Sequence, residues 1–377
     1  MAHSATDGSE LGEDQMHHAT LAAVVVIALL APVSAPAQDR VRADADGAGE
    51  WTLPRTPDGR PDLQGYWTTQ TFTPLERPEH LGDQEFFTEE EAAWLQQELT
   101  AEGVDPSARE ILDLIDIEDR AELQRYKYQA NRTPDERHHI HYDNEIWLRT
   151  PVPKGLSSRR TSLITWPRNG RVPPRTPEAA ARAAATRAAQ AHPSAFDSHE
   201  TRPLSERCIA WSHEGPPMMP PSYNDLHQIF QTPDHVVVFS ELSTYPPRII
   251  PLDGRPHVRD AIRQFPGDSR GRWEGDTLVV ETRNYAERRR FRGAGGALHV
   301  VERFTRAGPD RIHYEFTVTD PETWTSPWSA EIPMVRTDGP LFEYGCHEGN
   351  HDIRHILEIH RNLERQAAGD GTGTHAR

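Results

Sequence analysis

The pattern of apolar and polar positions divides this chain of 377 residues into two regions. From Ser205 onward, apolar residues recur at every second position, which is the period of a β-strand with one buried face. Turn-forming pairs such as Pro233-Asp234 and Asp338-Gly339 separate these stretches. We therefore expect successive antiparallel strands. The predicted strands are 226–232, 235–242, 248–252, 272–273, 277–284, 298–306, 311–319, 328–336 and 341–344.

The stretch Gly267–Thr282 lies in the middle of this series and contains its clearest hairpin. A short aromatic strand leads into the tight turn Glu274-Gly275-Asp276, and a longer strand follows. Many short strands with short connections predict an antiparallel barrel or sandwich, so the fold class is mainly β. The spacing of the turns is irregular, which makes a propeller the less favoured arrangement.

The region before Ser205 is mostly helical in pattern. Thr88 followed by three glutamates predicts a capped helix through about 98, and Thr176-Pro177-Glu178 caps an alanine-rich helix through about 191. Further helices are expected over 106–129 and 352–366, with short strands over 68–73 and 161–166. The expected organisation is a first strand plus helical region over 51–204, a β-barrel or sandwich over 205–350, and a C-terminal helix and tail over 351–377.

The N-terminal segment 1–37 has the pattern of a secretory signal peptide. An apolar run from Leu21 to Leu30 is too short to span a membrane and precedes Ala35-Pro36-Ala37, a small-residue cleavage pattern. The residues before Met16 are acidic, whereas signal peptides begin with positive charge, so Met16 is the expected true start. A flexible tail is expected over 38–50. These features predict an exported protein in the periplasm or secreted medium.

Composition narrows the choice of partners and of redox compartment. Residues 1–37 contain four acidic and no basic residues, so their removal changes the formal net charge from −17 to −13. An acidic protein is not expected to bind nucleic acid, and no second long apolar run predicts stable membrane insertion after signal cleavage. The two cysteines, Cys208 and Cys346, are expected to form one long-range disulfide, and two separate buried thiols are the alternative.

Two resemblances add to this interpretation. The motif Asp62-Leu63-Gln64-Gly65-Tyr66-Trp67 resembles the first-strand signature of calycin-type barrels, which include the lipocalins. This resemblance implies a calycin-like barrel that binds a small molecule. The helical region of about 100 residues between Trp67 and the β series is a departure from simple lipocalins.

A second resemblance covers most of the mature chain. It is to a family of uncharacterised exported bacterial proteins, and it implies a bacterial, exported protein without specifying an activity. The segments that carry it are Thr56–Trp67, Tyr142–Glu145, Gly267–Thr282, Glu302–Arg306 and Cys346–Asn350.

Glu302 is the first candidate catalytic residue. Strand alternation places Glu302 on the same face as Leu298, Val300 and Phe304, and a carboxylate on an apolar face has the raised pKa that suits a general acid or base. The opposite face carries His299, Val301 and Arg303, so one strand does not decide which face is inward. Arg303 or His299 would be the functional partner if that second face pointed inward, and a structural ion pair is the alternative for Glu302.

His257 and Asp268 form the second candidate. Both are expected in loops beside the central hairpin, where a histidine near an aspartate could be an oriented base, with Arg270 at the same edge. The structural alternative is that Asp268 caps a turn through backbone amides.

Two histidine-rich stretches could bind a metal ion. In the segment 138–145, His139 and His141 would share one side of an extended chain. The segment His347–His351 matches the H-E-x-x-H spacing of zinc proteases, but Gly349 and Asn350 disfavour the helix which that site requires. We expect a turn there, with His347 and Glu348 lining the closing end of the barrel.

The segment 215–224 could form part of a pocket. Its prolines stiffen it, while Met218, Tyr223 and Asn224 could contact an apolar ligand, with His299 as a further candidate binding residue. The alternative is a loop that covers a sheet edge. The sequence contains no phosphate-binding loop, no dinucleotide fingerprint after a strand and no nucleophile elbow.

The favoured hypothesis is an exported enzyme that binds a small, fairly apolar molecule in a β-barrel pocket. It would act by acid–base chemistry as a lyase, isomerase or hydrolase, without an organic cofactor. One alternative is a non-catalytic, lipocalin-like small-molecule-binding protein. The other is a metal-dependent hydrolase that uses one of the histidine-rich clusters and a bound metal ion.

Overall fold

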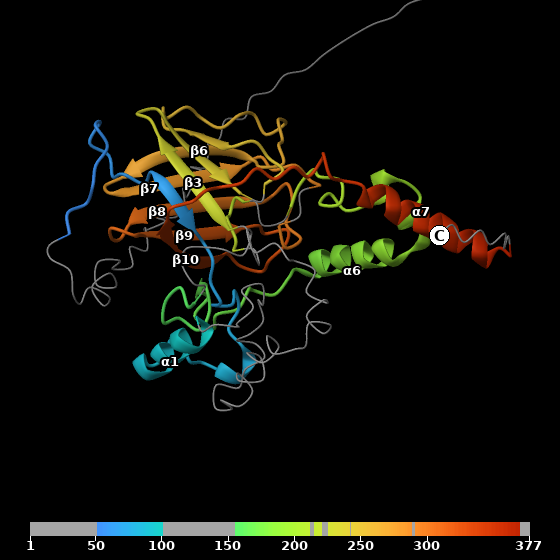
Figure 1. The fold of residues 1–377 in the computed structure, drawn as a ribbon, viewed down its shortest axis with the longest axis horizontal. Coiled ribbons are helices and arrows are strands. Elements are labelled where there is room, and N and C mark those ends of the chain that lie inside the picture. The colour runs from blue at the N-terminus through green and yellow to red at the C-terminus, as the bar shows by residue number, and fades with distance from the viewer. Residues whose placement is uncertain are drawn as a thin grey trace, which may run out of the picture. The chain divides into compact units, whose positions relative to one another are not determined.

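The computed structural model describes residues 51–100, 155–211, 215–220, 225–241, 243–288 and 291–369. Their main feature is one antiparallel sheet with the strand order β5-β4-β3-β1-β10-β9-β8-β7-β6, and the short strand β2 pairs with β10 beside this path (Figure 1). The strands are β1 (Gly65–Thr68), β2 (Ile164–Trp166), β3 (Leu226–Gln231), β4 (His235–Ser240), β5 (Arg248–Pro251), β6 (Asp268–Glu274), β7 (Thr277–Arg283), β8 (His299–Arg306), β9 (Arg311–Thr319) and β10 (Trp328–Thr337).

The sheet curves into a nearly closed, barrel-like structure, which confirms the expected mainly-β, antiparallel fold class. The end strands β5 and β6 approach each other without a continuous ladder of backbone hydrogen bonds. Side chains close the gap instead. A β-carbon built on Gly271 of β6 would lie 2.7 Å from Leu252 Cδ2 and 2.8 Å from Ile250 Cγ2. The strand therefore carries glycine where side chains from the β5 side reach across it.

Strand alternation produces the expected core. Every second residue of β8 and β9 is buried, and aromatic side chains fill the inward face, as in the pair Phe304 and Tyr314 with ring centroids 4.8 Å apart. The central hairpin follows the same rule, since Leu278 and Val280 are buried and Gly275 adopts a positive φ of 61° in the turn. A second, smaller core forms where two residues of the helix over 89–99 pack with two residues before it, and its buried members are Phe72, Phe87, Leu95 and Leu99.

The two ends of the barrel differ. At one end, which we call the hairpin end, short turns join β3 to β4, β6 to β7 and β8 to β9. The register of the antiparallel pairs places the connections 241–247, 284–298 and 320–327 at the opposite end, which we call the long-loop end. The connection 252–267 runs from the hairpin end to the long-loop end, where β6 begins. Longer connections make the long-loop end the better candidate for function.

The calycin-like motif lies at the hairpin end. The indole N–H of Trp67 donates to the carbonyl of Leu63 over 2.9 Å, and both side chains are fully buried. Arg306 stacks on the Trp67 ring at 4.7 Å, and Arg336 lies at 5.6 Å. This motif therefore closes the hairpin end and holds β1 between β3 and β10.

The helices largely follow the sequence prediction. Helix α1 (Glu89–Leu99) begins with a capping box between Thr88 and Glu91, and α6 (Pro177–Ala191) is capped by Thr176. Helix α7 (Asp352–Ala367) matches the expected C-terminal helix. In the described part of the chain, short 3-10 helices cover Glu79–Leu81, Pro193–Phe196 and His199–Thr201. None of the helices in the described residues is long and apolar enough to span a membrane. The predicted helix 106–129, the signal peptide 1–37 and the tail 38–50 lie outside the described residues.

Three predicted strands differ from the structure. Residues 341–344 form no strand, because the backbone N–H of Phe342 donates to the Glu241 carboxylate instead of joining the sheet. The first strand ends at Thr68, beyond which threonine hydroxyls accept backbone N–H groups of the same segment and compete with the ladder. The strand predicted over 272–273 is longer, Asp268–Glu274, since Gly271 belongs to the strand and not to a turn.

Replacement of Gly271 tests how the barrel closes. We expect Gly271→Ala to lower the free energy of unfolding by about 1–3 kcal/mol, because the new methyl group would overlap Ile250 and Leu252. Gly308→Ala is the matched control, since its β-carbon would meet no atom closer than 3.8 Å. Urea denaturation of both variants measures the difference, and equal stability of the two would contradict this account of closure.

Candidate functional site

A buried polar network crosses the barrel interior at the long-loop end. The carboxylate of Glu302, on β8, is fully buried and accepts two hydrogen bonds from the guanidinium of Arg248, one from Nη1 at 3.0 Å and one from Nη2. The hydroxyl of Tyr314 donates to Glu302 Oε1 over 2.8 Å. Arg248 also donates to Ser269 Oγ and Thr282 Oγ1, both at 3.0 Å. The inward face of β8 is therefore the one that carries Glu302.

The network fixes the protonation states of Arg248 and Tyr314. Burial by itself lowers the pKa of Arg248, but the charge of Glu302 and their hydrogen bonds outweigh it and raise that pKa above its usual value. Burial, followed by the charge of Glu302, raises the pKa of Tyr314 well above its usual value. Tyr314 therefore stays a neutral donor. Because its donors satisfy the Glu302 carboxylate, Glu302 is suited to holding Arg248 and Tyr314 in place.

The partners suggested for Glu302 lie elsewhere. Arg303 points to the outer face and forms an ion pair with Glu274 at 3.0 Å. His299 also faces outward, and its Nε2 lies 2.9 Å from Glu281. The prediction that Arg303 or His299 would act with Glu302 required the other face of β8 to be inward, and the burial of the strand excludes that arrangement. The sequence did not point to Arg248, because the barrel must close before Arg248 reaches Glu302.

His257 and Asp268 come together as expected. His257 Nδ1 lies 2.7 Å from Asp268 Oδ2, and each side chain is 7% exposed. Asp268 also accepts the backbone N–H of Val258 at 3.1 Å and pairs with Arg270 Nη1 at 2.9 Å. Within the described residues, His257 Nε2 is buried and has no hydrogen-bond partner. When an aspartate holds one ring nitrogen of a histidine and the second nitrogen is open, the histidine is oriented to act as a base.

The connection between β5 and β6 positions His257 against the outer face of the sheet. Asn284, at the end of β7, adopts a positive φ of 62° and donates through Nδ2 to the carbonyl of Val258 over 2.8 Å. Arg270 Nε donates to the carbonyl of Pro256 over 3.2 Å. These contacts bracket His257 on both sides and fix its ring beside Asp268. Asp268 is thus both a turn anchor and the partner of His257.

A third polar cluster, which the sequence prediction missed, lies where β3 and β4 reach the long-loop end. His227 is buried, with Nδ1 2.9 Å from Ser240 Oγ and Nε2 3.3 Å from Thr69 Oγ1. Asp225 is buried as well and accepts a hydrogen bond from Thr68 Oγ1 at 3.1 Å. The only sequence signal was a histidine on an apolar strand, which more often marks a satisfied core residue.

The proline-rich segment 215–220 enters the core beside the network of Glu302, Arg248 and Tyr314. Met218 is 2% exposed, and its backbone N–H donates to the Tyr314 hydroxyl oxygen over 2.9 Å. The hydroxyl of Tyr285 donates to the carbonyl of Pro216 over 3.2 Å. Residues 215–220 therefore cover the network from the long-loop end. The other two residues suggested for this pocket, Tyr223 and Asn224, lie outside the described residues.

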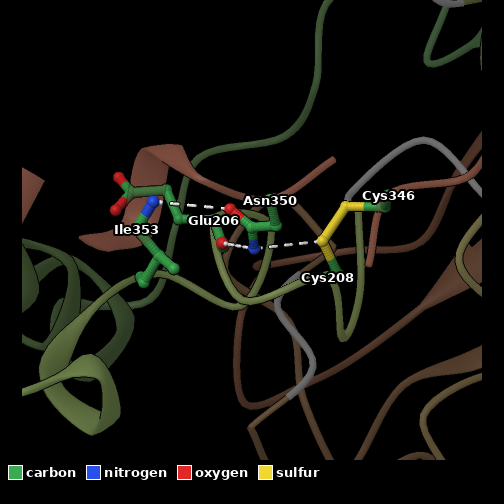
Figure 2. The surroundings of a disulfide bond; sticks show 5 residues. All are labelled: Glu206, Cys208, Cys346, Asn350 and Ile353. Atoms are coloured by element: carbon green, nitrogen blue, oxygen red, sulfur yellow. Dashed lines mark hydrogen bonds between the residues drawn. A yellow bond between two sulfur atoms is a disulfide. The ribbon is translucent and has the colours of Figure 1, made fainter. Parts of the chain in front are cut away.

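The two cysteines form the expected disulfide, with a Cα–Cα distance of 5.8 Å (Figure 2). Beside it, Asn350 Nδ2 donates to the carbonyl of Glu206 at 2.9 Å and to Cys208 Sγ at 3.3 Å, while Asn350 Oδ1 accepts the N–H of Ile353 at 3.4 Å (Figure 2). The disulfide and Asn350 therefore anchor the start of α7 to the segment before β3.

The H-E-x-x-H match does not form the helical zinc site of the proteases. Residues 346–349 form a turn, and α7 begins only at Asp352, so His347 and His351 do not share a helical face. His347 and Glu348 are exposed. No group of three potential metal ligands occurs in the part of the chain that the structure describes. The other suggested ligands, His139 and His141, lie outside it.

Comparison with known proteins finds no relative of this chain. No family model matches it, and neither the curated proteins nor the solved structures include a match. The resemblance to exported bacterial proteins therefore stays a prediction, and the function has to be argued from the site.

The network around Glu302 can be tested with a double-mutant cycle. Glu302→Gln leaves Arg248 charged and unpaired in the interior, so we expect a loss of about 3–5 kcal/mol in the free energy of unfolding. The double variant Glu302→Gln with Arg248→Met should lose less than the sum of the two single variants. Urea denaturation measures the cycle.

The surface pair Glu274 and Arg303 provides the control, because both side chains are about 40% exposed. Its coupling free energy should stay below about 1 kcal/mol. A coupling of the same size in both pairs would mean that Glu302 and Arg248 do not form a desolvated unit.

The outer face of β9 and β10 carries a histidine that links stability to pH. His313 Nε2 lies 2.5 Å from Glu331 Oε1. Burial lowers the pKa of His313, but the hydrogen bond and charge of Glu331, together with Glu315, raise it above its usual value of 6.5. The stability that this pair contributes is therefore fully present below pH 6.5 and is lost as the pH rises through the higher folded-state pKa.

We expect the difference in unfolding free energy between the natural protein and His313→Gln to be largest at about pH 5.5 and to shrink towards about pH 9. His80→Gln, at an exposed position in a 3-10 helix, is the control and should show no such trend. Urea denaturation at several pH values makes the measurement. A difference that grows with pH would show that the pKa shift has the opposite sign.

Proposed function

We propose that this protein is an exported enzyme that acts by acid–base chemistry on a small, fairly apolar molecule at the long-loop end of its barrel. The observation that carries the proposal is the His257 ring, whose Nδ1 is 2.7 Å from Asp268 while its buried Nε2 has no partner in the described residues. A histidine held in this way can accept a proton from a substrate carbon or from water, which are steps of lyases, isomerases and hydrolases.

Each residue has a separate role in this proposal. His257 Nε2 is the base, and Asp268 orients the ring and stabilises the imidazolium that forms. Arg270 fixes the Asp268 carboxylate through the contact at 2.9 Å. Glu302 has the supporting task of holding Arg248 and Tyr314, since its oxygens are occupied by their hydrogen bonds. No organic cofactor is needed for such a proton transfer.

The proposed location is the periplasm or the extracellular medium. The disulfide between Cys208 and Cys346 supports an oxidising compartment, and the signal-peptide pattern at 1–37 points the same way. Together with the acidic charge of the chain, this location favours a small molecule as the partner over nucleic acid.

The second candidate function is lipocalin-like binding without catalysis. The interior network favours it, because the hydrogen-bonding groups of that network already bond one another. Glu302 accepts from Arg248 and Tyr314, and Arg248 also donates to Ser269 and Thr282. An interior whose charged groups are already satisfied offers a ligand contact surface but no acid or base.

Metabolite profiling separates these two functions. Purified protein is incubated with a small-molecule extract, and His257→Gln, Asp268→Asn and the control His80→Gln are treated in parallel. We expect one compound to be consumed and another to form catalytically, with the rate lowered roughly 10²–10⁴-fold in His257→Gln and unchanged in the control. Thermal unfolding of each variant confirms that it is folded.

Two outcomes would contradict the proposal. Equal turnover by His257→Gln would remove His257 from the reaction. Depletion of a compound in proportion to the protein concentration, with no product and no effect of His257→Gln, would support the binding function instead.

A further inference from the structure

A cleft of about 480 Å³ lies apart from His257, between the segment that follows β1, the turn after β2 and the β7–β8 connection. Three arginines and two glutamates line it, together with two prolines and a leucine. The lining residues are Pro74, Leu75, Glu76, Arg77, Pro78, Glu79, Arg171 and Arg292. We propose that this arginine cleft binds a small organic carboxylate with an apolar body.

The positive charge of the arginine cleft is poorly compensated by the protein. Arg77 is 2% exposed and donates to Thr161 Oγ1, the carbonyl of Arg168 and the carbonyl of Gly82, none of which is a carboxylate. Burial lowers the pKa of Arg77, and the nearby charges of Glu85 and Asp83 offset this only in part. A bound carboxylate would supply the missing negative charge.

The second arginine, Arg171, has only a loose partner. Its Nη1 lies 3.8 Å from Glu79, whose side chain is 92% exposed. The carboxylate of the other acid, Glu76, accepts a hydrogen bond from the backbone N–H of Val172 over 2.7 Å. Among the described lining residues, three guanidinium groups face two carboxylates, so the lining itself carries more positive than negative charge.

Arg292 points most directly to a ligand. Its backbone adopts a positive φ of 52° in a tight turn, which the N–H of Ala294 closes by donating to the carbonyl of Phe291 over 2.9 Å. Arg175 Nη2 donates to the Arg292 carbonyl over 3.0 Å and helps hold it there. Within the described residues, the Arg292 side chain donates no hydrogen bond of its own. The turn therefore presents to the cleft an exposed guanidinium that has no hydrogen-bond partner within the described residues.

The lining also has a small apolar part, which favours one kind of carboxylate. Pro74, Leu75 and Pro78 add some hydrocarbon surface to a mainly polar lining, and Leu75 packs against the main core. A compact inorganic oxyanion would leave this surface exposed to water, whereas an aromatic or aliphatic acid would cover it. A guanidinium pairs with a planar carboxylate through two parallel hydrogen bonds, which Arg292 and Arg171 are free to provide.

Benzoate, benzamide and inorganic phosphate are the probes. Isothermal titration of the full chain should detect benzoate binding, while the neutral isostere benzamide and phosphate should bind at least about tenfold more weakly. Arg292→Gln and Arg171→Gln should each weaken benzoate binding about tenfold, as expected for the loss of one charge-assisted hydrogen bond. Arg187→Gln, on the exposed face of α6, is the matched control and should bind as the natural protein does.

Arg292→Gly separates the side chain from the backbone. Glycine accepts a positive φ without strain, so this variant should fold at least as well as Arg292→Gln and still lose benzoate binding. Binding that survives both substitutions at Arg292, equal binding of benzamide, or no benzoate binding to the natural protein would each overturn the proposal. Phosphate that competes as well as benzoate would also overturn it, because the site would then be a general oxyanion site. These outcomes leave the proposed role of His257 untouched.

Discussion

The hydrogen-bonded ion pair between Glu302 and Arg248 holds the barrel in its nearly closed form. Arg248 begins the edge strand β5, and its guanidinium reaches Ser269 of β6, Thr282 of β7 and Glu302 of β8. No continuous backbone ladder joins β5 to β6, so these side-chain bonds replace one. A fully buried carboxylate is costly unless it is paired, and the pairing is complete only when the barrel closes. Closure and charge neutralisation therefore depend on each other.

The same dependence explains what the sequence could and could not predict. Strand β9 was predicted with its observed bounds, Arg311–Thr319, because alternation is a local property. The proximity of His257 and Asp268 could be predicted too, since only a short loop separates them along the chain. Arg248 as the partner of Glu302 could not be predicted, because the two are 54 positions apart in the sequence and their contact crosses the barrel interior. His227 was missed for a similar reason, because one partner, Thr69, follows β1 and the other, Ser240, ends β4.

The errors in the predicted strands also have a common cause. Residues 341–344 are β-formers by composition, yet the disulfide and the contact with Glu241 hold them outside the sheet. Gly271 resembles a turn residue, but the strand needs glycine there because side chains from the β5 side occupy the space. In each place a contact distant in sequence overrode a local preference. Such contacts concentrate where the barrel closes and where the disulfide ties the chain together.

Chemistry at the long-loop end requires a group whose hydrogen-bonding capacity the fold has not used. Glu302, Arg248 and Tyr314 bond one another, which suits a rigid interior and leaves little capacity for a substrate. His257 differs, because Asp268 engages one ring nitrogen and the other is buried without a partner in the described residues. An unsatisfied buried polar atom costs about 1–3 kcal/mol. The described residues contain several such atoms, among them the indole nitrogens of Trp273 and Trp328, and His257 differs from these because an aspartate engages its other ring nitrogen. A substrate or water that binds Nε2 would satisfy that nitrogen, and this combination of an oriented ring with an open proton acceptor is the strongest argument for a function at His257.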